Sequence, residues 1–82
     1  MLTDYISAAM KRAKYKVIPE DNSYFGEIPG FRGVWANHAR LEQCRDELQE
    51  VLEGWIVLGL QKNARLPVVD GVSLNRRAKR VA

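Results

Sequence analysis

Apolar and polar positions along this chain alternate with two different periods. In the first segment, apolar side chains recur at the three- and four-residue spacing of a helix, at Tyr5, Ile6, Ala9, Met10 and Ala13. Thr3 and Asp4 stand before them, and both residue types cap helix starts well. The pattern predicts a helix over residues 3–14 with one apolar face.

The next segment changes to a two-residue period, which is typical of strands. Apolar and polar residues alternate over residues 15–28, with an interruption at Asp21 and Asn22. Because Asp and Asn accept the backbone angles of a tight turn, the interruption predicts a hairpin. The Pro-Gly pair at residues 29–30 marks a further turn, and we expect a third strand over residues 31–36.

A long helix is predicted over residues 40–62. Its apolar positions keep helical spacing, at Leu41, Cys44, Leu48, Val51, Leu52, Trp55, Ile56 and Leu58. Pro67 cannot continue a helix, so residues 66–69 are predicted as a short fourth strand, closed by a turn at residues 70–71. The expected fold class is α+β: an N-terminal helix, a three-stranded antiparallel meander, a long helix packed on the sheet and the short fourth strand.

The 82 residues are enough for one small domain, which buries only about 60% of the surface that its unfolded chain exposes. Because association adds buried surface, this thin core predicts a homo-oligomer, either a dimer or a tetramer. The lone Cys44 has no disulfide partner, which favours a reducing cytoplasm. No apolar run approaches the ~20 residues that span a bilayer, so no membrane association is expected.

Charge is distributed unevenly, although the net charge is only +3. Residues 1–16 carry four cations against one acid, residues 17–71 carry nine acids against five cations, and residues 72–82 carry four cations and no acid. The acidic middle suits docking of a basic protein, and the basic ends suit a phosphate backbone. We expect residues 72–82 to form a flexible basic tail after a helix over residues 1–14 and a domain over residues 15–71.

Three short motifs carry a family resemblance. They are Tyr24-Phe25-Gly26-Glu27-Ile28-Pro29-Gly30-Phe31, then Arg32-Gly33-Val34-Trp35-Ala36 leading into the long helix, and finally Leu66-Pro67. In this order, over residues 15–71, they resemble the HicB family of antitoxins. The resemblance implies a reduced ribonuclease H-like fold and a partner, a small basic HicA-type toxin that cleaves mRNA. That family usually has Thr or Ser as the helix cap where Arg40 stands, so we expect Asn37 to cap the helix one turn earlier.

Catalytic chemistry is not expected from the polar residues. Glu20 and Asp21 lie at the predicted turn, where acids are common, and alternation turns Glu27 away from the apolar strand face. His38 has no evident nucleophile or orienting partner, and Cys44 lies on an apolar helix face, where an inert thiol is usual. One Cys and one His give no metal framework, and the chain has no Gly-rich phosphate loop. We therefore expect no enzyme and no cofactor.

Two tryptophans and two helical glycines leave alternatives open. Trp55 is expected to pack the helix on the sheet, whereas Trp35 either ends an exposed strand or anchors an oligomer interface. Gly54 and Gly59 each cost about 1 kcal/mol relative to Ala within a helix. They indicate the close approach of another backbone, either from this domain or from a second copy.

Two candidate interfaces remain. Glu42, Asp46 and Glu50 share the polar side of the long helix and are the expected toxin-binding residues, through which the antitoxin would occlude the toxin by a protein–protein contact. The candidate nucleic-acid contact consists of the tail cations Arg76, Arg77, Lys79 and Arg80. The alternative function is accordingly a small repressor-like oligomer that binds DNA or another nucleic acid through its basic ends.

Overall fold

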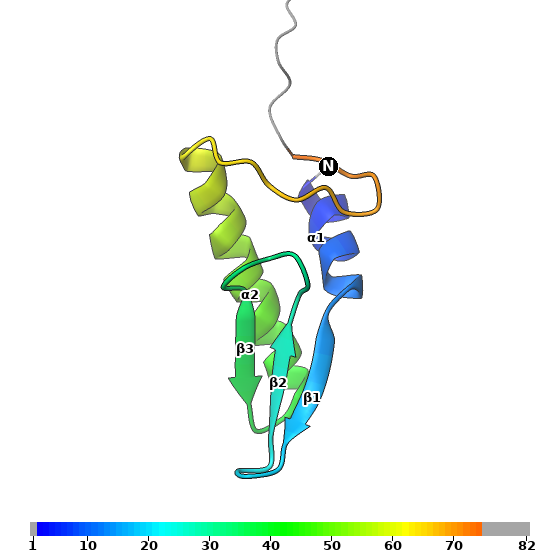
Figure 1. Cartoon of the computed structure of the whole chain (residues 1–82), viewed down its shortest axis with the longest axis vertical. Helices are drawn as coiled ribbons and strands as arrows, with labels where there is room; N and C mark the ends of the chain where they lie inside the picture. Colours follow the sequence, from blue (N-terminus) through cyan, green and yellow to red (C-terminus); the bar gives the residue numbers. More distant parts are fainter. Residues whose placement is uncertain (1, 75–82) are drawn as a thin grey trace, which may run out of the picture.

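The structure, a computed structural model, describes residues 2–74 and has two layers (Figure 1). In chain order the elements are α1 (Leu2–Lys11), β1 (Lys14–Ile18), β2 (Ser23–Glu27), β3 (Trp35–His38) and α2 (Leu41–Gln61). The strands form one antiparallel sheet in the order β1-β2-β3, and α2 packs along one face of it. The predicted α+β class, with its N-terminal helix, meander and packed long helix, is confirmed.

The turn between β1 and β2 falls where Asp21 and Asn22 predict it. Asn22 has a φ of 54°, and the Asp21 carboxylate accepts hydrogen bonds from the backbone N–H and the hydroxyl of Ser23, at 3.2 and 2.6 Å. Asn tolerates this left-handed conformation, and the short Asp side chain satisfies donors within the turn. The resulting register pairs Tyr15 with Gly26.

Gly26 lies on the side of the sheet that faces α2, where there is no room for a larger side chain. A Cβ atom at this position would stand 2.8 Å from two ring carbons of Tyr15 and 3.3 Å from the Sγ atom of Cys44. Because side chains alternate along a strand, Phe25 and Glu27 point to the opposite face of the sheet. The predicted separation of Glu27 from Gly26 is confirmed, since Glu27 is exposed and Gly26 is buried.

The hydrophobic core lies between the sheet, α2 and α1. From α2 it takes four residues spaced four apart: Cys44, Leu48, Leu52 and Ile56. From α1 it takes Tyr5 and Ala9, and the Tyr5 ring meets Phe31 edge-on with 6.1 Å between ring centroids. Trp55 is half-buried and packs on Phe31 at 5.2 Å. It therefore joins the helix to the loop before β3 rather than to the sheet itself.

The third strand begins later than predicted. The structure places it at Trp35–His38, whereas the alternation suggested residues 31–36. Residues 28–34 instead form two successive tight turns, closed by hydrogen bonds from Phe31 N–H to the Ile28 carbonyl and from Val34 N–H to the Phe31 carbonyl. Phe31 and Val34 belong to this loop, and both side chains are buried. These two apolar residues, three apart, therefore fill the core although their backbone is not part of the sheet.

The predicted fourth strand is wrong. Leu66 and Val69 are buried, but they are three residues apart, a spacing that would put them on opposite faces of a strand. Within residues 2–74 the segment's β-pairing is the isolated bridge between Val69 and Val72. The predicted turn at Asp70 and Gly71 is confirmed by their φ values of 48° and 80°. Buried side chains therefore hold this segment in place, an arrangement that a short apolar run in the sequence does not distinguish from a paired strand.

The bounds of α2 match the prediction to within one residue. The first helix was predicted to end at residue 14, but it ends at Lys11, since Lys14 already pairs with Glu27 in β1. The predicted cap of α2 is also wrong. Asn37 lies within β3, where its amide donates hydrogen bonds to the Ser23 hydroxyl and the Tyr24 carbonyl. The N-cap residue of α2 is Arg40, which is extended and makes no capping hydrogen bond with its side chain. The helix start consequently lacks the stabilisation that Ser or Thr supplies at this position.

The two glycines of α2 differ in their surroundings. A Cβ atom on Gly59 would stand 2.7 Å from a methyl carbon of Leu66, so the domain's own C-terminal segment makes a close approach there. At Gly54 a Cβ atom would meet nothing within 4 Å among the described residues. The expected close approach of another backbone is therefore found at neither glycine within residues 2–74, since the neighbour of Gly59 is the Leu66 side chain.

Candidate functional surfaces

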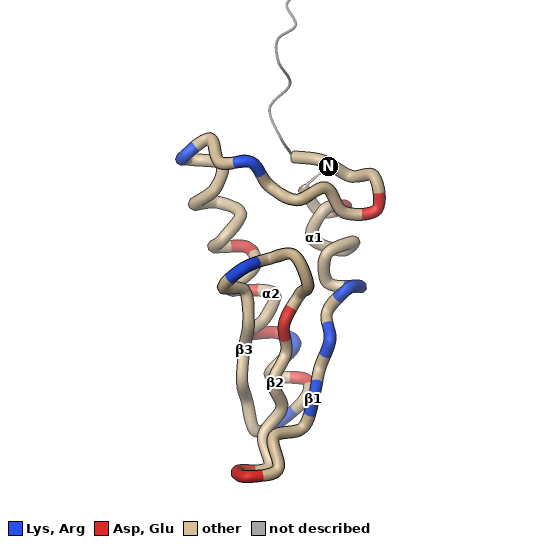
Figure 2. The backbone as a smooth tube through the Cα atoms, in the orientation of Figure 1, with Lys and Arg blue, Asp and Glu red and all other residues tan. Residues whose placement is uncertain are grey.

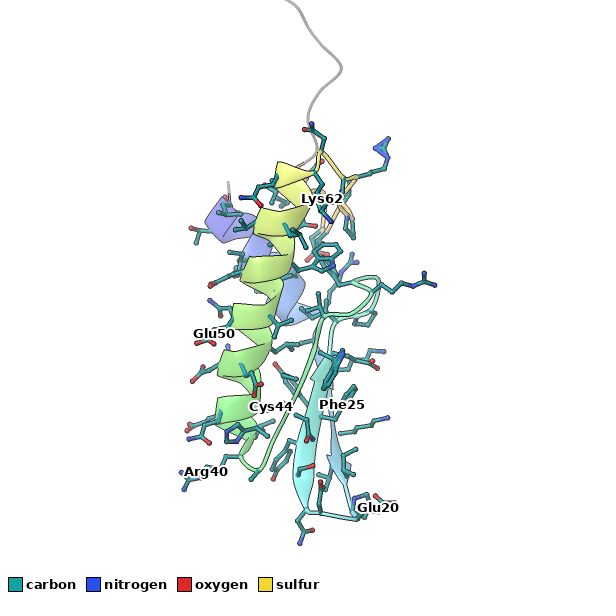
Figure 3. The ribbon with its side chains drawn as sticks, turned by 90° about the vertical axis from the view of Figure 1, so that its left-hand side faces the viewer. Glu20, Phe25, Arg40, Cys44, Glu50 and Lys62 are labelled. Carbon is teal, nitrogen blue, oxygen red and sulfur yellow. The ribbon has the colours of Figure 1, made fainter. Side chains whose placement is uncertain are left out.

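The three predicted toxin-binding residues lie together on α2. Glu42, Asp46 and Glu50 are four residues apart, so they occupy successive turns of one helix side, and all three are exposed. Leu48 and Leu52 hold the opposite side in the core, which fixes the three carboxylates away from the sheet; Figure 3 shows Glu50 on this outer side. Within residues 2–74, no cation forms an ion pair with them. We call these three residues the acidic face.

The same side of α2 becomes apolar toward its C-terminal end. Val57 and Leu60 are 52% and 45% exposed, and Val57 follows Glu50 at a spacing of seven residues on one line along the helix. Leu58 is also exposed, but it lies about 100° around the helix from Val57. Solvent-exposed aliphatic side chains grouped in this way are typical of an interface. The outer side of α2 thus has an acidic half and an apolar half.

A second surface, which sequence reasoning missed, lies on the sheet face that α2 leaves uncovered. Phe25 of β2 and Trp35 of β3 stack there, with 5.8 Å between ring centroids and 23° between ring planes. The ammonium nitrogen of Lys16 lies 5.4 Å from the centroid of the Phe25 ring. Lys14 and Glu27, a cross-strand pair, lie on the same side of the sheet. We call these five residues the open sheet face.

The open sheet face was missed because it depends on strand register. The alternation of β2 was evident in the sequence, but the start of β3 was predicted four residues too early, which left Trp35 near the end of a strand instead of at its beginning. Only the pairing of Glu27 with Trp35 brings the two aromatic rings together. The basic N-terminal residues were a usable signal, since Lys14 and Lys16 fall on β1 (Figure 2).

The residues considered for catalysis do not converge. The Cys44 side chain is fully buried, its Sγ donates a weak hydrogen bond to the Ala36 carbonyl at 3.6 Å, and burial followed by the charge of Glu47 raises the pKa of its thiol. Such a thiol stays protonated at neutral pH and is a poor nucleophile. The Nδ1 atom of His38 accepts a hydrogen bond from the Arg40 backbone N–H, which ties it to the start of α2.

No group of three His, Cys, Asp or Glu side chains among residues 2–74 is arranged to hold a metal ion. Glu20 and Asp21 lie in the β1–β2 turn, and Glu27 lies at the other end of β2. In the same part of the chain, neither helix is long and apolar enough to cross a membrane. The tail cations Arg76, Arg77, Lys79 and Arg80 lie outside the described residues.

Comparisons with known proteins identify relatives of this chain. The family model described as UPF0150-like matches residues 4–67. A solved structure, the crystal structure of TTHA0281 from Thermus thermophilus, is 36% identical in sequence and superposes with a TM-score of 0.85, over 93% of this chain and 94% of that one. A search among curated proteins found no match. Because the family model covers most of the chain, this protein belongs to the UPF0150-like family.

Proposed function

We propose that this protein is a HicB-type antitoxin that neutralises a small basic HicA-type toxin, an mRNA-cleaving ribonuclease, by docking it on the acidic face. Membership of the UPF0150-like family and the HicB-like motifs of the sequence support the assignment. The observation that carries it is the row formed by Glu42, Asp46 and Glu50, exposed and without ion-pair partners among residues 2–74. The protein itself performs no chemistry in this proposal, and it acts in the cytoplasm, where mRNA is found.

The physical basis is charge complementarity. The three carboxylates span about 12 Å along the helix at 1.5 Å per residue, a length that a row of cations lining an RNA path can match. A toxin that binds RNA needs such cations, so occupying them with carboxylates blocks the substrate. Complementary charge also steers the two proteins together and speeds their association.

The test compares two exposed acids that differ in position. Asp46→Lys, on the acidic face, should slow association with the coexpressed toxin and weaken rescue of growth, whereas Glu20→Lys, in the β1–β2 turn, should change neither. Both variants change the net charge by the same amount, and both side chains are exposed, so the fold should persist in each. Equal slowing by the two variants would show that overall charge matters and the acidic face does not.

We also propose that the protein is a homodimer formed through the apolar half of α2. Val57 and Leu60 supply its exposed aliphatic surface, and repulsion between two acidic halves favours an antiparallel pairing that keeps those halves apart. Light scattering should show a particle of twice the 9.4 kDa mass of the chain. The Val57→Lys variant should instead have the mass of a single chain. A single-chain mass for the unaltered protein at micromolar concentration would contradict the dimer.

A further inference from the structure

The open sheet face is an exposed aromatic surface that the core does not need. Trp35 is 54% exposed, yet its ring is held by stacking on Phe25, so it is presented to solvent in a fixed orientation. The ladder between β2 and β3 keeps the two rings on one side, and α2 is packed on the other side. In Figure 3, Phe25 and Glu50 lie on opposite sides of the protein. This surface is therefore separate from the acidic face.

Cations stand beside the aromatic pair. Lys16 is directly opposite Phe25 in the β1–β2 ladder, and its ammonium group lies over the Phe25 ring instead of beside a carboxylate. Lys14 is two residues earlier on the same strand and faces the same side. Exposed Arg32 adds a third cation from the loop that leads into β3. Surfaces that bind single-stranded nucleic acid combine two elements, aromatic rings on which bases stack and cations that contact the backbone. Both elements are present here.

A hollow adjoins this surface. It has a volume of about 450 Å³ and is lined by residues 27–35, which include Glu27 and Trp35 as well as the two tight turns between them. Its volume lies in the range that small-molecule sites occupy, it is open to solvent, and it shares Glu27 and Trp35 with the open sheet face. A base that stacks on Trp35 would have room for its sugar or for a neighbouring base in the hollow.

From this geometry we propose that the open sheet face binds single-stranded RNA. Bases stack on the exposed Trp35 ring, which Phe25 supports from behind, while Lys14, Lys16 and Arg32 contact phosphates. Glu27, exposed and paired with Trp35 across the strands, accepts a hydrogen bond from a ribose 2′-hydroxyl, a donor that DNA lacks. A protein partner fits this surface less well, because it would have to bury two lysines and a glutamate along with the aromatic pair.

The test uses the fluorescence of Trp35 in the full-length chain. The Trp55→Phe substitution leaves Trp35 as the single tryptophan. The four tail cations are also replaced by Gln, so that their affinity for phosphates does not contribute to the measured binding. Titration with a 12-nucleotide oligouridylate should quench Trp35 emission. Trp35→Ala, followed by anisotropy of a labelled RNA, should weaken binding at least about ten-fold.

Matched charge variants locate the phosphate contacts. Lys16→Gln should lower the slope of log affinity against log salt by about 0.7, the value for one phosphate contact on a single strand. Lys62→Gln, an exposed lysine at the end of α2, should leave the slope unchanged. Circular dichroism melts confirm that each variant is folded. Equal effects of the two lysine variants overturn the proposed site.

Three other outcomes also overturn the proposal. The first is the absence of quenching up to ~100 μM RNA, the weak limit of non-specific binding. The second is equal affinity for a 12-nucleotide oligothymidylate, which removes the role given to Glu27 and the assignment to RNA. The third is self-association through this face. Concentrating the protein without RNA would then change Trp35 emission and double the particle mass, and Trp35→Ala would abolish the doubled mass. That result would assign this face to a second copy. None of these measurements involves a toxin, so they do not depend on the proposed function.

Discussion

The hydroxyl of Tyr5 donates a hydrogen bond to the backbone carbonyl of Pro67, 2.5 Å away and 62 positions later in the chain. The Tyr5 residue is buried and Pro67 is half-buried, so the bond joins α1 to the segment after α2 at the edge of the core. Arg12 and Asp70 add an exposed ion pair at 3.3 Å between the same two segments. Because that ion pair is exposed, it contributes at most about 1 kcal/mol, and the better shielded Tyr5 bond is the more important link.

Removing this hydroxyl should destabilise the protein. Tyr5→Phe keeps the ring but leaves the Pro67 carbonyl without its donor, so the free energy of unfolding should fall by about 1–3 kcal/mol. Urea denaturation measures the change. Tyr24→Phe is the control, since no hydrogen bond of the Tyr24 hydroxyl is found among residues 2–74, and it should be close to neutral. An equal loss in both variants would show that the bond to Pro67 adds nothing specific.

Stability should also fall at high pH. Burial raises the pKa of Tyr5 above its ordinary value of 10.0, and burial likewise raises that of Tyr15. The folded protein therefore retains protons that the unfolded chain releases, so the full stability is present below pH 10 and is lost as the pH rises above it. The urea midpoint should decrease between about pH 9 and pH 11, and Tyr5→Phe should reduce that decrease. A midpoint independent of pH over this range would contradict the burial of both phenols.

Two glycines should respond in opposite ways to alanine. Gly54→Ala places a methyl group in open space on a helix, which should raise the free energy of unfolding by up to about 1 kcal/mol. Gly26→Ala forces a methyl group against the Tyr15 ring and the Cys44 sulfur, which should lower it by about 1–3 kcal/mol. Thermal melts distinguish the two. A loss of stability in Gly54→Ala would indicate that a second copy packs closely against this position.

The start of α2 should gain from a capping side chain. Arg40 already has the extended backbone of an N-cap residue but makes no side-chain hydrogen bond there. Arg40→Thr should therefore stabilise the protein by about 0.5–2 kcal/mol, because its hydroxyl can accept a bond from a free N–H of the first turn. Urea denaturation tests this, with Arg40→Ala as the control for loss of the charge alone. No gain of Thr over Ala would show that the first turn is already satisfied.

Periodicity predicted the helices well because it arises from burial on one side. The four-residue spacing from Cys44 to Ile56 fixes the buried side of α2, and the exposure of Glu42, Asp46 and Glu50 follows from it. The hairpin was predictable for a local reason, the conformational freedom of Asn22. These features depend on neighbours within a few residues.

Features that depend on distant partners were not predictable in this way. The apolar run at residues 66–69 is compatible with a strand, but whether a strand forms depends on a neighbouring strand, and none lies beside it among residues 2–74. Phe31 similarly looks like the beginning of a strand and instead fills the core beneath Trp55 from a loop. The stacked pair of Phe25 and Trp35 required the β2–β3 register, which the pattern did not fix.

During synthesis, the partners of the Tyr5 hydrogen bond appear at very different times. At 5–20 residues per second, the ribosome adds Pro67 about 3–12 s after Tyr5. Both strands of the β1–β2 hairpin are synthesised much earlier than Pro67. During this interval the buried side of α1 lacks part of the core that it packs against in the folded protein. We therefore expect a nascent chain that ends before Pro67 to hold α1 loosely and to expose Tyr5 to proteases. Of the two helices, α1 is made first and is fixed in place last.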